Sequence, residues 1–204
     1  MEPPSTEEVL LKGIAASPGI AIGPVYLFRK QAPRVKEKAL DASAVEGEIE
    51  RLRQALARSQ KELRKILEFA EQKLGSEQAK IFEAQVMILE DAVLFDAITS
   101  RIANELRNAE FLVHDEIEKY HRMMVAAKDE YTRERAHDVE DVRGRLLRNM
   151  QEHKLVSRLD GARVIVSQNL TAADALIFSR NEVLGYLTEI GGITSHSVLL
   201  ARAL

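Results

Sequence analysis

The chain of 204 residues contains no cysteine. This absence excludes disulfides, thiolate catalysis and cysteine-rich zinc sites, and it leaves histidine, aspartate and glutamate as the candidate reactive or metal-ligating groups. The chain also lacks an apolar run long enough to span a membrane, and its first residues, MEPPSTEEVLLK, place acids where a secretory signal would place bases. We therefore expect a cytoplasmic protein that does not enter a membrane, with residues 1–12 as a short leader.

A strong charge of either sign is lacking as well. The net charge is −3 and the isoelectric point is about 6.0, so no basic field points to nucleic acid as a partner. The sequence has no phosphate loop, no dinucleotide fingerprint and no nucleophile elbow. With 46% hydrophobic and 30% charged residues, the composition is typical of a globular chain with one sizeable core or two small ones.

Proline is absent and glycine is scarce between residues 41 and 153. This stretch is rich in Ala, Glu, Lys, Leu and Arg, which predicts a helical block. Its first helix begins with the form of a capping box, Ser43 and Glu46, and its apolar residues recur about every 3.5 positions. Gly75 and Ser76 are expected to end this helix and to cap the next. Three more helices, at roughly 77–106, 109–127 and 132–151, predict a four-helix bundle or a pair of helical hairpins.

The segments on either side of the block have a different pattern. Residues 13–28, GIAASPGIAIGPVYLF, predict a strand, a turn and a second strand. After residue 160 the pattern reads strand, helix, strand, helix, which indicates a parallel or mixed α/β unit. The economical arrangement is one α/β domain formed by residues 13–40 and 154–204, with residues 41–153 inserted into it as a helical domain.

One histidine stands at the start of the last predicted helix, in GGITSHSVLLARAL. If Thr194 or Ser195 is the N-cap, His196 lies in the first turn, where unpaired N–H groups and the helix dipole favour phosphoryl oxygens and a neutral, nucleophilic ring. Gly191 and Gly192 would let the backbone approach closely. The alternative is a pair of ordinary caps beside an idle surface histidine, and the spacing alone does not decide between the two.

Two Glu-x-x-His pairs, Glu118 with His121 and Glu134 with His137, resemble half of a carboxylate-bridged di-iron site. That site needs a helix between the two pairs, and about a dozen residues are too few to form one. His114, Glu118 and His121 share a helix face, but such a lone triad is more often part of a solvated face. We therefore predict no metal site.

Acidic residues surround an apolar run in the second predicted helix. Glu77, Glu83, Glu90 and Asp91 flank Phe82 and the run 86–89, and this stretch contains more apolar residues than one buried stripe requires. Such a surplus indicates either a docking surface for a basic partner or a helix that is buried over most of its circumference.

Four segments resemble a known family, in the family's own order. The segment GGITSHSVLLARAL resembles the phosphohistidine motif of the phosphoenolpyruvate-utilising enzymes, G-G-x-T-S-H-x-x-x-x-A-R. The segments GIAASPGIAIGPVYL, IFEAQVMILED and DEYTRERAHDVEDVRGRLLRN resemble the N-terminal segment, the second helix and the end of the helical subdomain of enzyme I of the bacterial sugar phosphotransferase system. The histidine motif alone does not separate enzyme I from pyruvate phosphate dikinase or phosphoenolpyruvate synthase, whereas the helical segments do.

The resemblance implies an α+β or α/β fold, in which a phosphohistidine α/β domain carries an inserted all-helical subdomain that binds the phosphocarrier HPr. His196 would accept the phosphoryl group and pass it to a histidine of HPr, with Thr194 and Ser195 steadying the group. Arg202 matches the arginine of the motif. The HPr surface implied by the resemblance consists of Glu77, Glu83, Met87, Ile88, Glu90 and Arg135.

The sequence departs from the family at two places. Ala175 stands where many members have a threonine near the active histidine, which leaves the resting position of His196 open. Ala92 and Val93 stand where members often have further acids, so HPr docking is expected to depend more on apolar contact.

Enzyme I continues well past the point that corresponds to Leu204. Its further segments include a C-terminal barrel that binds phosphoenolpyruvate and Mg²⁺ and forms the dimer. The last helix here shows no C-cap signal, so we expect a fragment. The resemblance implies that this fragment is monomeric and has no cofactor of its own. The resemblance implies a phosphotransferase whose fragment exchanges phosphoryl groups with phospho-HPr but does not phosphorylate itself from phosphoenolpyruvate. Two alternatives are an HPr-binding module without transfer and a nitrogen-related enzyme I that serves another carrier.

Overall fold

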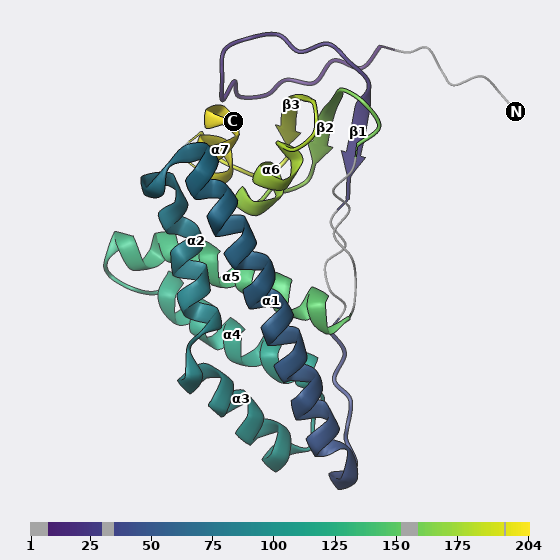
Figure 1. Ribbon diagram of the computed structural model, residues 1–204, viewed down its shortest axis with the longest axis vertical. Coiled ribbons are helices and arrows are strands. Elements are labelled where there is room, and N and C mark those ends of the chain that lie inside the picture. The colour runs from purple at the N-terminus through teal and green to yellow at the C-terminus, as the bar shows by residue number, and fades with distance from the viewer. Residues whose placement is uncertain (1–7, 30–34, 152–158, 194) are drawn as a thin grey trace, which may run out of the picture.

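The structure, a computed structural model, describes residues 8–29, 35–151, 159–193 and 195–204, and for Tyr131, Glu134, His137 and His196 it describes the backbone alone. Within these ranges the chain is mostly helical, with a small three-stranded parallel sheet at one end of the helices (Figure 1). The predicted combination of a helical part with a small α/β part is therefore confirmed.

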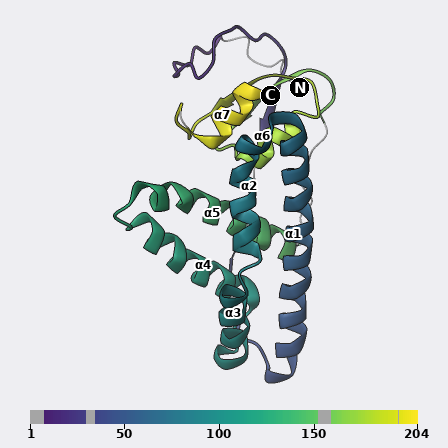
Figure 2. The same ribbon diagram turned by 60° about the vertical axis from the view of Figure 1, so that its left-hand side comes forward.

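Five helices form the helical part. Their bounds are α1 Val45–Leu74, α2 Ser76–Leu89, α3 Ala92–Glu105, α4 Ala109–Val125 and α5 Glu130–Met150. Helix α1 packs against α2, and α4 packs against α5. In Figure 2 the tip of the α4–α5 hairpin projects to one side of the column formed by α1, α2 and α3.

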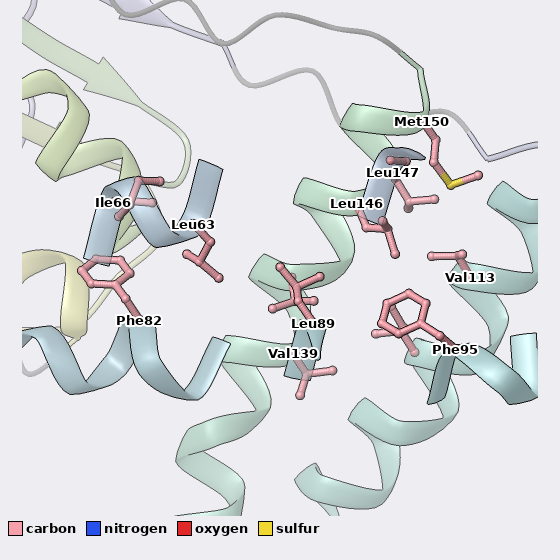
Figure 3. Close-up of a cluster of buried hydrophobic side chains, with 14 of the residues drawn as sticks. Leu63, Ile66, Phe82, Leu89, Phe95, Val113, Val139, Leu146, Leu147 and Met150 are labelled. Carbon is pink, nitrogen blue, oxygen red and sulfur yellow. The ribbon is translucent and has the colours of Figure 1, made fainter. Parts of the chain in front are cut away.

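Apolar side chains from all five helices meet in one core. Figure 3 shows Leu63, Ile66 and Phe82 together where α1 faces α2, and Phe95 and Val113 close to the end of α5. These side chains are buried because each helix directs an apolar stripe inward, as the 3.6-residue period requires. The same core extends to the C-terminal segment through Leu176 and Leu200.

The sheet joins segments from both sides of the helical part. Its strands are β1 Val25–Phe28, β2 Arg163–Ser167 and β3 Val183–Thr188, paired in parallel in the order β1-β2-β3. Helix α6, Ala172–Phe178, connects β2 to β3, and helix α7, His196–Ala203, follows β3. The domain boundaries given above stay a prediction, and the boundary between His153 and Lys154 lies outside the described residues.

Helix α6 covers one face of this sheet. A second apolar cluster lies between them, in which the ring of Phe28 packs edge-on against Phe178 at 5.0 Å between centroids. Helix α6 also contacts the helical part, and the guanidinium of Arg180, just after α6, lies 4.4 Å from the centre of the Phe69 ring on α1. Because α7 packs on α6, these contacts also fix α7 relative to α1.

The predicted second helix, 77–106, is in fact two helices. Asp91 has extended backbone angles, and its carboxylate accepts hydrogen bonds from the amides of Val93 at 2.9 Å and Leu94 at 3.3 Å. This N-cap stabilises a new helix start in the middle of an apolar pattern that reads as continuous. The prediction of four helices was therefore wrong by one.

The predicted capping box of the first helix is wrong, whereas Gly75 ends this helix and caps the next as predicted, without Ser76. The residues 42–44 form a short 3₁₀ turn, Ala44 is the N-cap of α1, and neither bond of a capping box between Ser43 and Glu46 forms. At the next junction Gly75, with φ of +84°, serves as C-cap of α1 and N-cap of α2, so that Ser76 is already helical. Because of the 3₁₀ turn, the N-cap of α1 lies one residue later than the Ser43 that the capping-box pattern predicts.

The prediction of two strands in residues 13–28 holds for the second strand only. In the described residues before Val25 the structure has neither strand nor helix. Ile14, Ile20 and Ile22 are almost fully exposed there. An apolar pattern predicts a strand only where a neighbouring strand pairs with it, and the described ranges place none beside this segment.

Candidate functional site

The site begins at the turn that leads into α7. Gly191 has φ of +145°, a conformation that favours glycine, and it lies close to the hydroxyls of Thr188 and Ser195. Ser195 has extended backbone angles and is the N-cap of α7, and its carbonyl accepts the first helical bond, from the amide of Leu199 at 3.0 Å. Of the two predicted caps the structure selects Ser195, whereas Thr194 lies outside the described residues.

The backbone of His196 forms the first position of α7. In an α-helix the N–H groups of the first turn have no partner within the helix. The Ser195 hydroxyl does not cap them; it lies 3.2 Å from the hydroxyl of Ser197. The start of α7 therefore keeps the properties of an anion-binding helix terminus, with His196 at its first residue.

Arg202 lies in the last turn of the same helix and is exposed. It follows His196 by six positions, which corresponds to about 9 Å along the helix axis. The two positions are therefore at opposite ends of α7, and Arg202 is not at the helix start where an anion would bind. Its cation instead complements the negative end of the helix dipole.

A groove of about 500 Å³ runs between α2, α5 and α7. Its apolar lining consists of Ile81, Ala84, Leu199, Leu200 and Ala203, and its polar lining consists of Glu77, Gln78, Lys80, Arg135 and Asp138. Two predicted contact residues, Glu77 and Arg135, are therefore brought together beside the helix that begins with His196. The other lining residues were missed, because only the tertiary packing of three distant segments brings them together.

The acids predicted for docking differ in how they are paired. Glu77 forms an exposed ion pair with Lys80 at 2.5 Å, and its hydrogen bond and charge raise the pKa of that ammonium group. Glu90 accepts a hydrogen bond from Arg64 of α1. Glu83 is exposed on α2. Glu77 and Glu90, two of the three predicted acids, therefore each form an ion pair with a cation of the same chain.

The predicted apolar contacts, Met87 and Ile88, also differ. Met87 is 70% exposed, whereas Ile88 is half-buried and packs against the main core. Val93, one of the two departures from the family's acids, is 79% exposed. The exposed apolar surface at the end of α2 thus consists chiefly of Met87 and Val93.

Ala175, the other departure, is fully buried in the cluster between α6 and the sheet. Its carbonyl accepts a hydrogen bond from the hydroxyl of Tyr186 at 3.4 Å, and burial raises the pKa of Tyr186 to about 12. The methyl side chain of alanine suits this apolar position, since a hydroxyl there would need its own partner.

The candidate metal triad on α4 is engaged with a cation. Arg143 of α5 donates to the carboxylate of Glu118, and its Nη1 lies 3.4 Å from Nδ1 of His114. In the ranges that the structure describes, no group of three His, Asp or Glu residues is placed to hold a metal ion. The side chains of Glu134 and His137 lie outside these ranges. No helix of the described part is both long and apolar enough to cross a bilayer.

Two family models match the chain. Residues 12–135 match the N-terminal region of the PEP-utilising enzymes, and residues 159–204 match the mobile domain of the same enzymes. Among curated proteins, the phosphoenolpyruvate-protein phosphotransferase of Listeria monocytogenes is 38% identical over 196 residues, and that of Bacillus subtilis is 36% identical over 196 residues. Each alignment covers 95% of this chain and 34% of the relative. The chain thus spans about a third of the length of these relatives.

Two solved structures of enzyme I proteins are also similar to this chain. A solution structure of enzyme I superposes with a TM-score of 0.82 at 39% identity, and the match covers 95% of this chain and 79% of that one. The N-terminal domain of a nitrogen enzyme I superposes with a TM-score of 0.68 at 25% identity, over 92% and 77% of the two chains. Both the sequence and the arrangement of the helices and strands are therefore shared with these proteins.

Proposed function

This chain belongs to the PEP-utilising enzymes, within which it is the N-terminal part of an enzyme I, and we propose that it carries a phosphoryl group on His196 and exchanges it with a phosphocarrier protein of the HPr type. The observation that supports this most strongly is the groove between α2, α5 and α7. It places the helix that carries His196 beside the two helices that contribute the proposed docking residues Glu77 and Arg135.

In the proposed reaction a phosphoryl group moves between two histidines. The N–P bond to the carrier's imidazole breaks as an N–P bond to a ring nitrogen of His196 forms, and each imidazole takes up or releases the proton that this exchange requires. The protein's contribution is to align the two rings and to stabilise the phosphoryl oxygens. The first-turn N–H groups of α7, with Thr194 and Ser195, are the proposed donors to these oxygens.

The proposed docking surface comprises Glu77, Glu83, Met87, Ile88, Glu90 and Arg135. The first four lie on helix α2, Glu90 is the C-cap of that helix, and Arg135 lies on α5. A carrier bound along α2 would lie next to the groove and hence next to α7. Arg202, at the other end of α7, is proposed to stabilise the helix rather than to contact the phosphoryl group.

Phosphoenolpyruvate and Mg²⁺ are not assigned to these residues. The described part of the chain offers no cluster of His, Asp or Glu side chains that fits a cation. The resemblance assigns both ligands, and the dimer, to the part of the longer relatives that this chain does not match. No step of the proposed exchange uses a metal ion.

Incubation with ³²P-labelled phospho-HPr tests the proposal. We expect the wild-type chain to gain label that is released by acid and retained in base, as phosphohistidine is. His196→Ala should gain none, whereas His121→Ala, the same substitution on α4, should gain as much as wild type. Equal labelling of His196→Ala and wild type would show that His196 does not accept the phosphoryl group.

A binding module without transfer is the competing function. Chemical-shift changes upon titration with HPr, combined with no transfer of label from phospho-HPr, would favour it. The similarity to a nitrogen enzyme I adds a second carrier to the same assay. We expect preference for the sugar-system carrier, because the identity to the other enzyme I structure is higher, 39% against 25%.

A further inference from the structure

A buried arginine lies where α5 meets the start of α6. Arg145 of α5 is 6% exposed, and among the described residues its guanidinium has one hydrogen-bond acceptor, the carboxylate of Glu62 at 3.4 Å from Nη1. Its Nε is buried and has no partner in the same part of the chain. Since a guanidinium carries N–H donors on every nitrogen, Arg145 has fewer acceptors than it has donors.

The acceptor that Arg145 has is shared. The same carboxylate oxygen of Glu62 also accepts a hydrogen bond from Arg148 of α5. Burial lowers the pKa of Arg145, and the neighbouring cation of Arg148 lowers it further. The charges of Glu62, Asp141 and Asp174 act in the opposite direction without reversing this effect. A buried charge whose hydrogen bonds are incomplete destabilises a fold, so a further acceptor at Arg145 would be favourable.

A cavity of about 20 Å³ lies beside Arg145. Its lining includes Asp141, Arg145 and Arg148 of α5 and Thr171, Ala173 and Asp174 at the start of α6. A single water molecule needs about 10–15 Å³ of such space, so the cavity fits one water and is too small for a phosphate or a metabolite. The lining has two cationic and two anionic side chains. No net charge therefore favours an ion over a neutral molecule in this cavity.

A water molecule suits both kinds of charged group in this lining, because it accepts from a guanidinium and donates to a carboxylate. The carboxylate of Asp174, which is 4% exposed, accepts hydrogen bonds through Oδ2 from the amide of Thr171 at 3.1 Å and from its hydroxyl at 2.7 Å. A carboxylate has about four acceptor sites in all, so it can also accept from a water. Asp174 and Arg145 attract each other through charge, although no direct hydrogen bond joins these two described side chains.

We propose that one water molecule occupies this cavity, accepts a hydrogen bond from the guanidinium of Arg145 and donates one to the carboxylate of Asp174. The water thereby joins α5 of the helical part to α6. Because α7 packs on α6, the same bridge helps to hold the helix that begins with His196. Bridging waters of this kind are enthalpically almost as favourable as direct hydrogen bonds. The inference does not depend on the proposed function, since no carrier takes part in it.

Nuclear magnetic resonance of the ¹⁵N-labelled wild-type chain tests the proposal. A water that stays in the cavity for longer than the molecule takes to tumble should give NOE and ROE cross-peaks of opposite sign with the side-chain N–H groups of Arg145. The Nε–H of Arg101, which donates to Glu105 at 2.6 Å, is the internal control and should give no such pair. Thr171→Asn keeps a good N-cap residue without an exchanging hydroxyl, so the Arg145 cross-peaks should persist. Their absence in wild type, or their loss in Thr171→Asn, would overturn the proposal.

Filling the cavity is the second test. Ala173→Val adds two methyl groups to a residue of the lining and should abolish the cross-peaks between Arg145 and water. Ala172→Val makes the same change at the neighbouring buried alanine, which is not among the residues that line the cavity, and should keep them. The amide chemical shifts of α1 report whether each variant is folded. Cross-peaks that survive in Ala173→Val, or that disappear equally in folded Ala172→Val, would contradict the assignment of the water to this cavity.

Discussion

The helical part and the sheet bury their apolar residues to different extents. In the helices, Phe82 and Ile98 are fully buried in a core to which five helices contribute. In the sheet, Val25, Leu27 and Leu187 lie on the face opposite α6 and are more than half exposed. Parallel sheets normally have both faces covered, whereas on the face opposite α6 Val164 of the central strand is buried but these three side chains are not. The comparison teaches that the proposed docking helices enclose a core to which the helix with His196 also contributes, through Leu200, whereas part of the sheet stays exposed.

The largest expected loss in free energy of unfolding comes from a substitution in the core of the helical part. Phe82→Ala removes a fully buried ring between α1 and α2 and should lower the free energy of unfolding by about 3–5 kcal/mol. Urea unfolding followed by far-UV circular dichroism measures this loss. Val93→Ala, at an exposed position on α3, should change the free energy by less than about 0.5 kcal/mol. Similar losses in the two variants would show that Phe82 does not lie in a core.

The helices themselves and the junction at Gly75 were largely predictable, whereas the junction at Asp91 was not. The α1 pattern repeats for 30 residues, so its period overrides local irregularities. Asp91 is a good N-cap residue, yet it stands between apolar runs on both sides, and sequence alone does not show that the helix axis changes there. The groove was beyond prediction for a related reason. Residues such as Ile81 and Leu199 meet only because α6 and α7 pack against the helices.

A second prediction concerns the ion pair at the base of the helical part. Burial by itself raises the pKa of Glu110, but hydrogen bonds from Arg51 and Asn108 outweigh this effect, so that the folded-state pKa lies below the ordinary value of 4.5. The pair therefore stabilises the fold fully above pH 4.5, and this contribution is lost as the pH falls through the lower folded value.

Glu110→Gln should accordingly lower the free energy of unfolding at pH 7 by about 1–2 kcal/mol. Below pH 4.5 the difference from wild type should shrink, because the wild-type carboxylate also becomes neutral. Urea titrations at pH 7, 5 and 3.5 measure it. Glu68→Gln, at an exposed position on α1, is the control and should follow wild type at every pH. A deficit for Glu110→Gln that does not depend on pH would contradict the assigned ion pair.

A third prediction separates the cap that the structure contains from the cap that the sequence pattern suggests. Asp91→Ala removes the acceptor for two amides at the start of α3 and should cost about 1 kcal/mol. Ser43→Ala, at the expected capping box of α1, should cost close to nothing, since its hydroxyl caps no helix. Thermal unfolding of both variants tests this. A larger loss of stability for Ser43→Ala than for Asp91→Ala would show that the capping box at Ser43 forms after all.

The smallest effect is expected on the open face of the sheet. Leu187 on β3 is 58% exposed, so Leu187→Ser should change the free energy of unfolding by less than about 0.5 kcal/mol. Ile165→Val, on β2 and on the face covered by α6, deletes only one methylene group but should cost about 1 kcal/mol, because Ile165 is fully buried. Urea unfolding at two protein concentrations compares them. The contrary result is a larger loss in free energy of unfolding for Leu187→Ser than for Ile165→Val, seen only at the higher protein concentration. It would mean that a second molecule covers this face. The difference in burial between the helices and the sheet would then apply only to the isolated chain.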